Sequence, residues 1–510
     1  MRSGITRAET QSRRVAFGPK HLRGVSGEGL RLYSLGALAS VRAVDTKTNA
    51  TDCLTAAGLP AGDVEAWLQT EPGEAIEFSA DRTKFSDYWA KSARLSGRLP
   101  QKPRRNASEH AAAELIQGKA RDARLSFLRR HVDAVYDALT QQRSRFVRVE
   151  ELAIRAADVV PGLVPTAQEI AAEDGLLQRD KSGLEIDQGL FLSAVLGSAR
   201  SGRHLCHAML LPRPEAQALL PQFERDGAVK LDGASVQRIG KAAVVTQNNP
   251  RFLNAEDQTS LDGAEICVDL ALLDRASEIA VMRGAAVEHP KYKGRRVFGA
   301  GINLTHLYHG RIPFVWYLKR DLGYVNKIYR GLAFDGDAAP DEFGGDTIEK
   351  PWIAAVESFA IGGHCQVLLV MDYVLAERSA FLTLPARKEG IIPGAANMRL
   401  PRFTGDRIAR QAIQYERRLD CDSPQGRLIC DEIVETGAMD AAIERVVEGL
   451  TSSGVVSAAS NRRAFRITQE PLDTFRAYFA VYAREQAYCH FSPALIGNLE
   501  RHWNAQSRKP

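Results

Sequence analysis

The sequence predicts an α/β protein with helical regions before and after its α/β core. Between residues 229 and 376, short apolar runs of the length of buried strands alternate with longer segments of helical periodicity. This order is typical of a largely parallel sheet. From residue 107 to about residue 225 the apolar residues recur about every 3.6 positions, which predicts helices. The chain has 510 residues, enough for more than one domain.

Residues 1–105 are the first of four predicted regions, and we expect an irregular N-terminal extension that is partly disordered. Glycine and proline interrupt this segment, and 101–105 has the composition of a linker. Short elements are compatible with Tyr33–Val44 and with Asp63–Leu68. The extension contains no motif that points to a function.

Residues 106–226 are predicted to form an all-α region. From Leu125 to Leu139 the apolar residues follow a helical period, with charged residues between them. Further helices are expected, separated by prolines, at 149–157, 166–174, 188–196 and 215–223. The region has no catalytic motif, so we interpret it as a scaffold or a contact between subunits.

The α/β core is expected from residue 227 to residue 437, and a C-terminal helical region from 438 to 510. Strands of the core are predicted at 229–231, 236–245, 278–282, 297–300, 352–356 and 373–376. Helices of the core are predicted at 258–275, 312–331 and 363–371. The C-terminal helices are predicted at 438–450, 455–466 and 471–499.

The composition excludes several classes of protein. No apolar run approaches the roughly 20 residues of a membrane helix, and the N-terminal residues contain no apolar signal core. A formal charge of +5 does not argue for nucleic acid, although it suits an anionic small ligand. We therefore expect a cytoplasmic protein without membrane or nucleic-acid partners. The seven cysteines form no C-x-x-C pair and the histidines no compact cluster, so we expect reduced thiols and no metal site.

Two glycine-rich loops follow predicted strands of the core. Gly362 and Gly363 precede a predicted helix, and Gly299-Ala300-Gly301 lies earlier in the chain. Glycines at such turns let the backbone approach a ligand and leave N–H groups unpaired. Those N–H groups suit an oxygen atom that gains negative charge. A tight helix-sheet crossing that needs glycine for packing is the alternative interpretation.

This pair of loops resembles the crotonase (enoyl-CoA hydratase/isomerase) superfamily, in which two such loops supply the oxyanion-hole amides for a thioester enolate. The resemblance implies a crotonase-like ββα superhelix core and a homo-oligomer, a trimer or a dimer of trimers. It places the two donors at the backbone N–H groups of Ile302 and Gly363. It also places Ala300, Gly301 and Asn303 in the substrate-binding loop.

A third stretch supports the same resemblance. The run N-P-R-F-L-N-A at 249–255 resembles the loop N-x-P-x-x-x-N-A of the superfamily. There a basic residue at the position of Arg251 lies near the adenosine end of CoA. The resemblance also lets His289, with Arg295 and Arg296, face CoA. Solvated loop side chains are the alternative for Arg251 and for His289.

The type of crotonase chemistry depends on residues that are missing here. Hydratases of the superfamily use two glutamates as acid and base, and the matching positions hold Gln366 and Ala386. An amide and a methyl group cannot transfer protons in this way. The runs L-P-A at 384–386 and G-I-I-P-G-A-A at 390–396 match the pattern of the superfamily and fix this register.

The runs at 299–308, 357–366 and 386–397 resemble a branch of the superfamily that oxygenates an arylacetyl-CoA without metal or flavin, in the biosynthesis of glycopeptide antibiotics. The resemblance implies that CoA is part of the substrate, that O2 is the co-substrate and that no cofactor is used. It places Leu304, Ala386 and Ile391 around an oxygen pocket, with Leu304 also against the substrate. As ordinary core residues these three are equally well explained.

The same resemblance places a polar pocket around the substrate ring, formed by Glu256, Arg320 and Gln366. Glu256 would accept a hydrogen bond from a ring hydroxyl or assist deprotonation, and the sequence does not separate these roles. A surface ion pair on a helix is the alternative for Arg320. Another crotonase isomerase or thioester hydrolase, and a non-catalytic crotonase fold, are the alternative functions.

Overall fold

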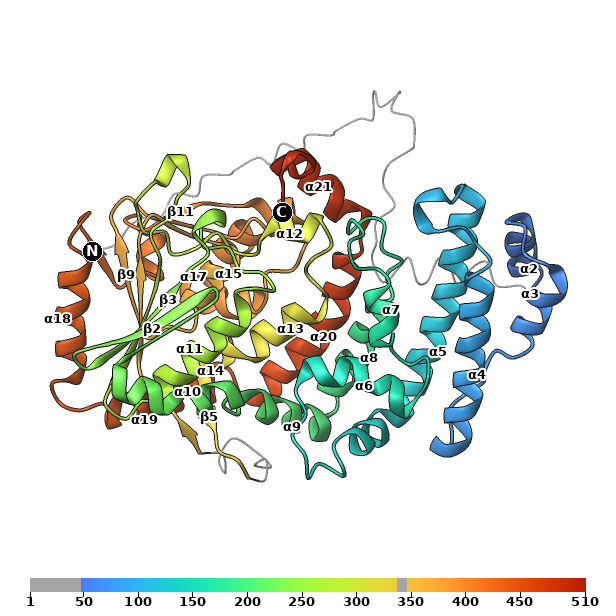
Figure 1. The fold of residues 1–510 in the computed structure, drawn as a ribbon, viewed down its shortest axis with the longest axis horizontal. Helices are drawn as coiled ribbons and strands as arrows, with labels where there is room; N and C mark the ends of the chain where they lie inside the picture. The colour runs from blue at the N-terminus through green and yellow to red at the C-terminus, as the bar shows by residue number, and fades with distance from the viewer. Residues whose placement is uncertain (1–46, 337–345) are drawn as a thin grey trace, which may run out of the picture. The chain divides into compact units, whose positions relative to one another are not determined.

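A seven-stranded sheet runs through the α/β part of the protein (Figure 1). The strand order is β1-β2-β3-β4-β7-β9-β12. The strands are β1 (Ala228–Leu231), β2 (Ala234–Ile239), β3 (Ala242–Gln247), β4 (Ile279–Gly284), β7 (Trp352–Val356), β9 (Tyr373–Glu377) and β12 (Glu432–Val434). The first three strands pair antiparallel, and every later pairing is parallel. This confirms the predicted α/β class with a largely parallel sheet.

The computed structural model describes residues 47–336 and 346–510. The short element expected at Tyr33–Val44 therefore lies outside the described residues. Residues Cys53–Pro510 form one compact unit. The α/β core and the helical regions around it are parts of this unit.

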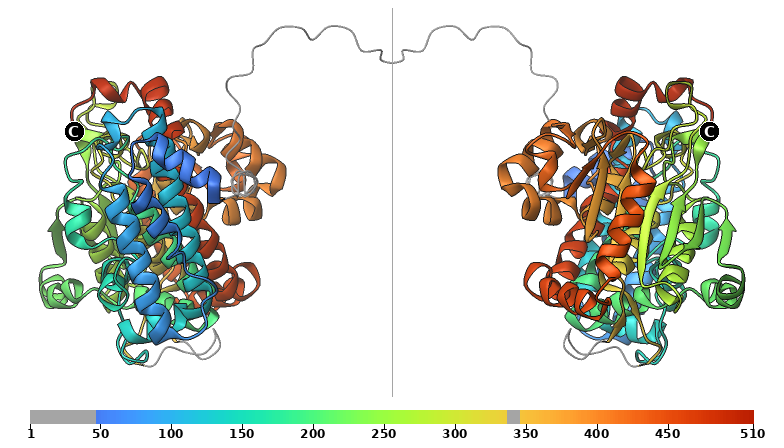
Figure 2. Two further views of the ribbon diagram at one scale, coloured as in Figure 1. Left: turned by 90° about the vertical axis from the view of Figure 1, so that its right-hand side faces the viewer. Right: turned by 90° about the vertical axis from the view of Figure 1, so that its left-hand side faces the viewer.

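The central strands are buried on both faces, as their near-continuous apolar sequences require. All residues of β4 and of β7 are buried. One face packs against α18 (Met439–Thr451), whose Met439, Ala442 and Val446 meet the sheet at spacings of three and four residues. Figure 2 shows α18 lying along the strands. The other face carries α11 (Leu261–Leu273).

A smaller sheet positions the second glycine-rich loop. Its strands are β8 (Phe359–Ile361), β10 (Phe381–Thr383) and β11 (Leu419–Asp420), in the order β11-β10-β8. Strand β8 pairs in parallel with β10, so the Gly362 turn starts from a hydrogen-bonded strand end. Strands β5 (Leu332–Ala333) and β6 (Thr347–Ile348) form a separate antiparallel pair.

The region from 107 to 226 is helical, as predicted. Its helices are α5 (Ala107–Leu139), α6 (Val149–Val159), α7 (Ala167–Ala171), α8 (Glu185–Gly197), α9 (Ala199–Leu210) and α10 (Pro214–Asp226). Helix α8 lies against α20 (Leu472–His490), which comes from the other end of the unit (Figure 1). The contact is close because Gly189 presents no side chain where α20 passes.

We expected an irregular segment up to residue 105, and this prediction is wrong for the residues from 47 onward, which the structure describes. Residues 47–104 contain α2 (Lys47–Ala56), α3 (Ala61–Leu68), α4 (Phe78–Ser96) and the short 3-10 helix η2 (Lys102–Arg104). Helix α4 buries Phe85, Trp89 and Leu95 at helical spacing, and the Phe85 ring packs 5.3 Å from that of Phe127 in α5. The glycines and prolines that suggested a loop lie mostly between these helices, and α4 itself contains neither residue.

Several predicted elements of the core are shorter than expected. The strand expected at 236–245 is the hairpin β2–β3, which turns at Gly240 with a positive φ of 56°. The stretch 297–300 makes only an isolated bridge. The helix expected at 312–331 is broken at Gly323 into α13 (Val315–Leu322) and α14 (Tyr324–Arg330).

The remaining elements complete the core and its C-terminal end. The helix expected at 363–371 is the short α15 (Gly363–Leu368), and the one expected at 471–499 ends at His490 before α21 (Pro493–Trp503). The others are α12 (Leu304–Tyr308), α16 (Ala386–Glu389), α17 (Ala396–Tyr415), α19 (Val456–Gln469), η3 (Pro250–Phe252), η4 (Pro290–Tyr292), η5 (Gly426–Leu428) and η6 (Ala505–Ser507).

Two expectations about the chain as a whole can be compared with this fold. All seven cysteines lie among the described residues and have free thiols, as predicted. Among helices of the two described ranges, none combines the length and the apolar composition that crossing a membrane requires.

We predict that the contact between α8 and α20 limits stability. A Cβ atom on Gly189 would lie 2.4 Å from that of Ala487, whereas a Cβ on Gly197 would meet nothing within 4 Å. Gly189→Ala should therefore cost about 1–3 kcal/mol through overpacking. Gly197→Ala is the matched control in the same helix. Thermal unfolding followed by circular dichroism should give a lower midpoint for Gly189→Ala alone, and equal midpoints would contradict the close approach.

Candidate active site

Two backbone loops from different parts of the chain meet at the centre of the site. Gly299 and Ala360 form a parallel bridge, in which the Ile361 N–H donates to the Gly299 carbonyl over 3.0 Å. Gly301 has a positive φ of 77°, and a Cβ on it would lie 2.9 Å from the Ile361 carbonyl oxygen and 3.1 Å from the Gly363 nitrogen. Only glycine allows this approach.

The two predicted oxyanion donors face one cavity. Ile302 and Gly363 both line it. Ile302 forms a parallel bridge with Glu256, and its neighbours Gly301 and Asn303 make the bonds of that bridge. Among the described residues, no acceptor pairs with the N–H of Ile302 or with that of Gly363, the first residue of α15. This arrangement can donate two hydrogen bonds to one ligand oxygen.

His364 connects the two loops from behind. Its Nδ1 accepts the Gly301 N–H over 3.0 Å, and its Nε2 is hydrogen-bonded to Gln247 Oε1. Burial lowers the pKa of the imidazole to about 4, so the ring is neutral at physiological pH. Because Nδ1 accepts, Nε2 carries the proton and donates it to Gln247. His364 directly follows Gly363 in the chain. Through the Gly301 N–H it holds the loop that carries Ile302.

The predicted ring residues Glu256 and Arg320 form a buried pair. Arg320 Nε donates to Glu256 Oε2 over 2.9 Å, and the Tyr324 hydroxyl donates to Oε1 of the same carboxylate. Burial acts to raise the pKa of Glu256, but the charge of Arg320 and the hydroxyl of Tyr324 help to hold it below its ordinary value. Glu256 is thus ionised, and each of its oxygen atoms accepts a hydrogen bond within the protein.

Arg320 joins this pair to the second glycine loop. Its guanidinium donates to the Gly363 carbonyl over 2.8 Å, to Asp321 Oδ1 over 2.9 Å and to Gln366 Oε1 over 3.3 Å. The side chain is 2% exposed, so the alternative of a surface ion pair is wrong. The structure brings together Glu256, Arg320 and Gln366, the three polar residues assigned to the ring.

The other predicted residues lie in different surroundings. Ile391 lines the same cavity, whereas Ala386 and Leu304 are not among its lining residues in the part of the chain that the structure describes. Arg251 and His289 are exposed. The Arg251 guanidinium stacks on Phe252, 4.9 Å from the ring centre. Both side chains are thus exposed, and neither is among the residues that line the cavity.

The cavity also contains residues that the sequence did not indicate. They are Trp316, Tyr317, Asp321, Glu389, Ile392, Pro393, Gly394 and Tyr482. Glu389 lies one turn after Ala386 on α16, so its spacing from a position already singled out was the available signal. Tyr482 comes from α20, and nothing in its local sequence pointed to this cavity.

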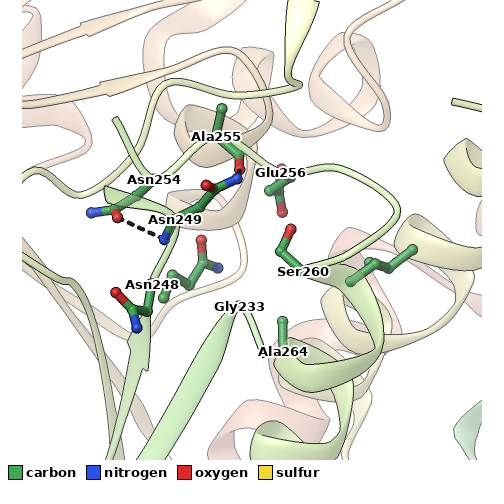
Figure 3. Close-up of a pocket in the computed structure, with 10 residues that line it drawn as sticks. Gly233, Asn248, Asn249, Asn254, Ala255, Glu256, Ser260 and Ala264 are labelled. Atoms are coloured by element: carbon green, nitrogen blue, oxygen red, sulfur yellow. Dashed lines mark hydrogen bonds between the residues drawn. The ribbon is translucent and has the colours of Figure 1, made fainter. Parts of the chain in front are cut away.

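A second cavity shares Glu256 with the first as a lining residue. Figure 3 shows the residues that line this second cavity. The asparagines of the 249–255 run build its wall. The Asn249 N–H donates to Asn254 Oδ1 over 3.0 Å, and Asn254 Nδ2 donates to the carbonyls of Ala285 and Val297. Asn254 also has a positive φ of 56°. These amides hold the loop that carries Glu256, which explains the motif structurally.

Known proteins agree with this geometry. The profile of the family described as enoyl-CoA hydratase/isomerase matches residues 346–474. The (3,5-dihydroxyphenyl)acetyl-CoA 1,2-dioxygenase of Amycolatopsis orientalis is 45% identical over 402 residues, which cover 79% of this chain and 91% of the relative. The short-chain-enoyl-CoA hydratase of Clostridium acetobutylicum is 25% identical over 49% of this chain and 87% of its own length.

Among solved structures, the carnitinyl-CoA hydratase from Mycobacterium avium is 21% identical and gives a TM-score of 0.44, over 55% of this chain and 98% of that one. The chain belongs to the enoyl-CoA hydratase/isomerase family, whose fold is that of the crotonases. Within the family it is an enzyme of the dioxygenase branch that the Amycolatopsis orientalis relative represents.

We predict that His364 positions the donor loop. His364→Ala should lower kcat/KM by about 10²-fold, the effect of a small misplacement near the reacting atoms, because Gly301 loses the acceptor of its N–H. His502→Ala, on the exposed side of α21, is the control. Steady-state kinetics on folded proteins measures the effect, and wild-type values for His364→Ala would contradict the positioning role.

Proposed function

We propose that the protein oxygenates 3,5-dihydroxyphenylacetyl-CoA with O2, without metal or flavin, to 3,5-dihydroxyphenylglyoxylate and free CoA. One observation supports the proposal: Ile302 and Gly363 of the two glycine loops line one cavity, and neither N–H has an acceptor among the described residues, in a chain that is 45% identical to a dioxygenase of that substrate. Another crotonase-type isomerase or thioester hydrolase is the alternative.

The first step is formation of an enolate. Loss of a benzylic proton sends an electron pair to the thioester oxygen, which then accepts hydrogen bonds from Ile302 and Gly363. Such preorganised donors are typically worth about 2.7–4 kcal/mol each in the transition state. Because these donors belong to the backbone, side-chain substitutions act on them only through the shape of the loops.

The polar end of the cavity suits a dihydroxyphenyl ring. A buried ring hydroxyl needs a partner, and the ionised carboxylate of Glu256 can accept its hydrogen bond. Glu256 already pairs with Arg320 and Tyr324, and its pKa is held low. Of the two roles that the sequence left open, this supports hydrogen bonding to the substrate over removal of its proton.

Oxygenation then uses the electrons of the enolate. In the proposed sequence, O2 adds at the benzylic carbon, the resulting peroxide attacks the thioester carbonyl, and the C–S bond breaks as CoA leaves. The O–O bond of the cyclic peroxide then breaks as the second benzylic proton is lost to solvent, which gives the ketone and the carboxylate of the product. Both oxygen atoms of O2 enter the product, and the substrate supplies all the electrons. The oxygen pocket predicted at Leu304, Ala386 and Ile391 remains a proposal, supported by Ile391 in the cavity wall.

We also propose a cytoplasmic homo-oligomer, a trimer or a dimer of trimers, that acts in antibiotic biosynthesis. Apolar side chains on α19 support self-association, since Val456 is 82% exposed and Phe465 62% exposed in the single chain. The proposed partners are the acyl-CoA substrate and O2 alone.

The proposal predicts that metal-stripped protein remains active. After exhaustive chelation, 3,5-dihydroxyphenylacetyl-CoA is added, and O2 uptake and free thiol are followed together. Uptake coupled one-to-one with CoA release is expected, at the rate of the untreated protein. Thiol release without uptake would favour a hydrolase, and activity that tracks with iron, copper or flavin would refute the cofactor-independent mechanism.

A second prediction concerns recognition of the ring. Glu256→Gln removes a charged acceptor, and hydrogen bonds to charged groups contribute about 1.5–3 kcal/mol, or roughly 10- to 150-fold in kcat/KM. The loss should be larger for the dihydroxyphenyl thioester than for phenylacetyl-CoA, which has no ring hydroxyls. An equal loss on both substrates would show that Glu256 acts only by supporting Arg320.

A further inference from the structure

One carboxyl group in the cavity has no part in the mechanism described so far. Glu389 is the last residue of the short helix α16, is 5% exposed and lines the cavity together with Ile302 and Gly363. A Cβ atom built on Gly362 would lie 3.8 Å from Glu389 Oε1. The carboxyl group therefore lies beside the backbone that leads into the Gly363 donor.

Glu389 differs from the other carboxyl groups of this cavity in having no fixed partner. Glu256 accepts from Arg320 and Tyr324, and Asp321 accepts from Arg320. Within residues 47–336 and 346–510, no hydrogen bond or ion pair holds the carboxyl group of Glu389. Its oxygen atoms can thus take up a proton without breaking a contact within the protein, whereas those of Glu256 and Asp321 already accept hydrogen bonds from Arg320.

We propose that Glu389 is the base that removes the benzylic proton, a role that rests on the proposed function. The benzylic C–H bond breaks, the proton bonds to the Glu389 carboxylate, and the electron pair moves to the thioester oxygen held by Ile302 and Gly363. When CoA later leaves as a thiolate, Glu389 returns the proton to sulfur. The carboxylate is then restored, and no further reagent is consumed.

The electrostatic surroundings suit this role. Burial and the nearby Glu416 raise the pKa of Glu389 to about 7, where a general base is both available and effective near neutral pH. The other titratable and charged groups around it are Tyr317 from α13, Tyr482 from α20, and Arg320, Asp321 and Glu256 across the cavity. Arg387 and Lys388 of α16 pair with Glu416 instead.

The test separates proton transfer from oxygenation. Wild type, Glu389→Gln and the exposed control Glu448→Gln, whose side chain is 71% exposed on α18, are incubated with 3,5-dihydroxyphenylacetyl-CoA in D2O without oxygen. NMR follows exchange of the benzylic protons, and an oxygen electrode follows uptake in aerated samples. Exchange should fall by about 10²–10⁴-fold in Glu389→Gln alone, the usual contribution of a general base. Exchange at the wild-type rate would overturn the proposal.

If Glu389→Gln does not fold, a second variant tests the same proposal. Glu416→Gln removes a neighbouring negative charge, so the acid limb of the exchange rate should move from about pH 7 to lower pH. An unmoved limb would overturn the role of Glu389. If the wild-type protein exchanges the benzylic protons but takes up no O2, the proposed oxygenation alone is refuted. If the wild-type protein does not exchange these protons, both the oxygenation and the role of Glu389 are refuted.

Discussion

The site depends on the close approach of two loops, whose glycines leave room for the two backbones to meet. The crossing of 299–302 over 360–363 leaves no room for a side chain at Gly301, and it brings Ile302 and Gly363, whose N–H groups have no acceptor within the described ranges, to the wall of one cavity. A buried polar group without a partner costs about 1–3 kcal/mol. His364 fixes the crossing from the opposite strand end, because its Nδ1 satisfies the neighbouring Gly301 N–H over 3.0 Å.

Beside the crossing, the cavity has one rigid end and one reactive end. At the rigid end Arg320 makes four contacts, to Glu256, Asp321, Gln366 and the Gly363 carbonyl. Removing one partner from such a buried set typically costs about 3–5 kcal/mol because a charge is left uncompensated. At the other end Glu389 has no such partner in the described parts of the chain, so it can gain and lose a proton without rearranging the cavity.

The sequence was sufficient to predict what is local. It predicted the α/β class and both glycine loops, because strand ends and glycines are visible in a short window. Ile302 and Gly363 line one cavity in the structure, and their role as donors stays a prediction. It also selected Glu256, Arg320 and Gln366 through the family resemblance, and these residues meet in the structure. The fold adds His364, whose role depends on Gln247 and Gly301, residues more than sixty positions away.

Other differences have equally physical causes. Helix α4 was missed although its buried residues recur at helical spacing, because the glycines and prolines on either side of it were given more weight. Glu389 was missed because the matching position of the hydratase glutamate is Ala386, and the helical turn of α16 moves a different carboxyl group into the cavity. Short strands and broken helices at Gly240 and Gly323 show how a single glycine divides an otherwise continuous apolar pattern.

The packing of α20 on α8 has a consequence for how the active enzyme arises. Helix α20 spans Leu472–His490 and supplies Tyr482 to a cavity whose other walls come from residues 256–394. During synthesis these walls leave the ribosome well before α20 does. The nascent chain therefore exposes an incomplete cavity until residues 472–490 have been synthesised. Catalytic competence is acquired only when this helix, remote in sequence from the other walls, docks and closes the cavity.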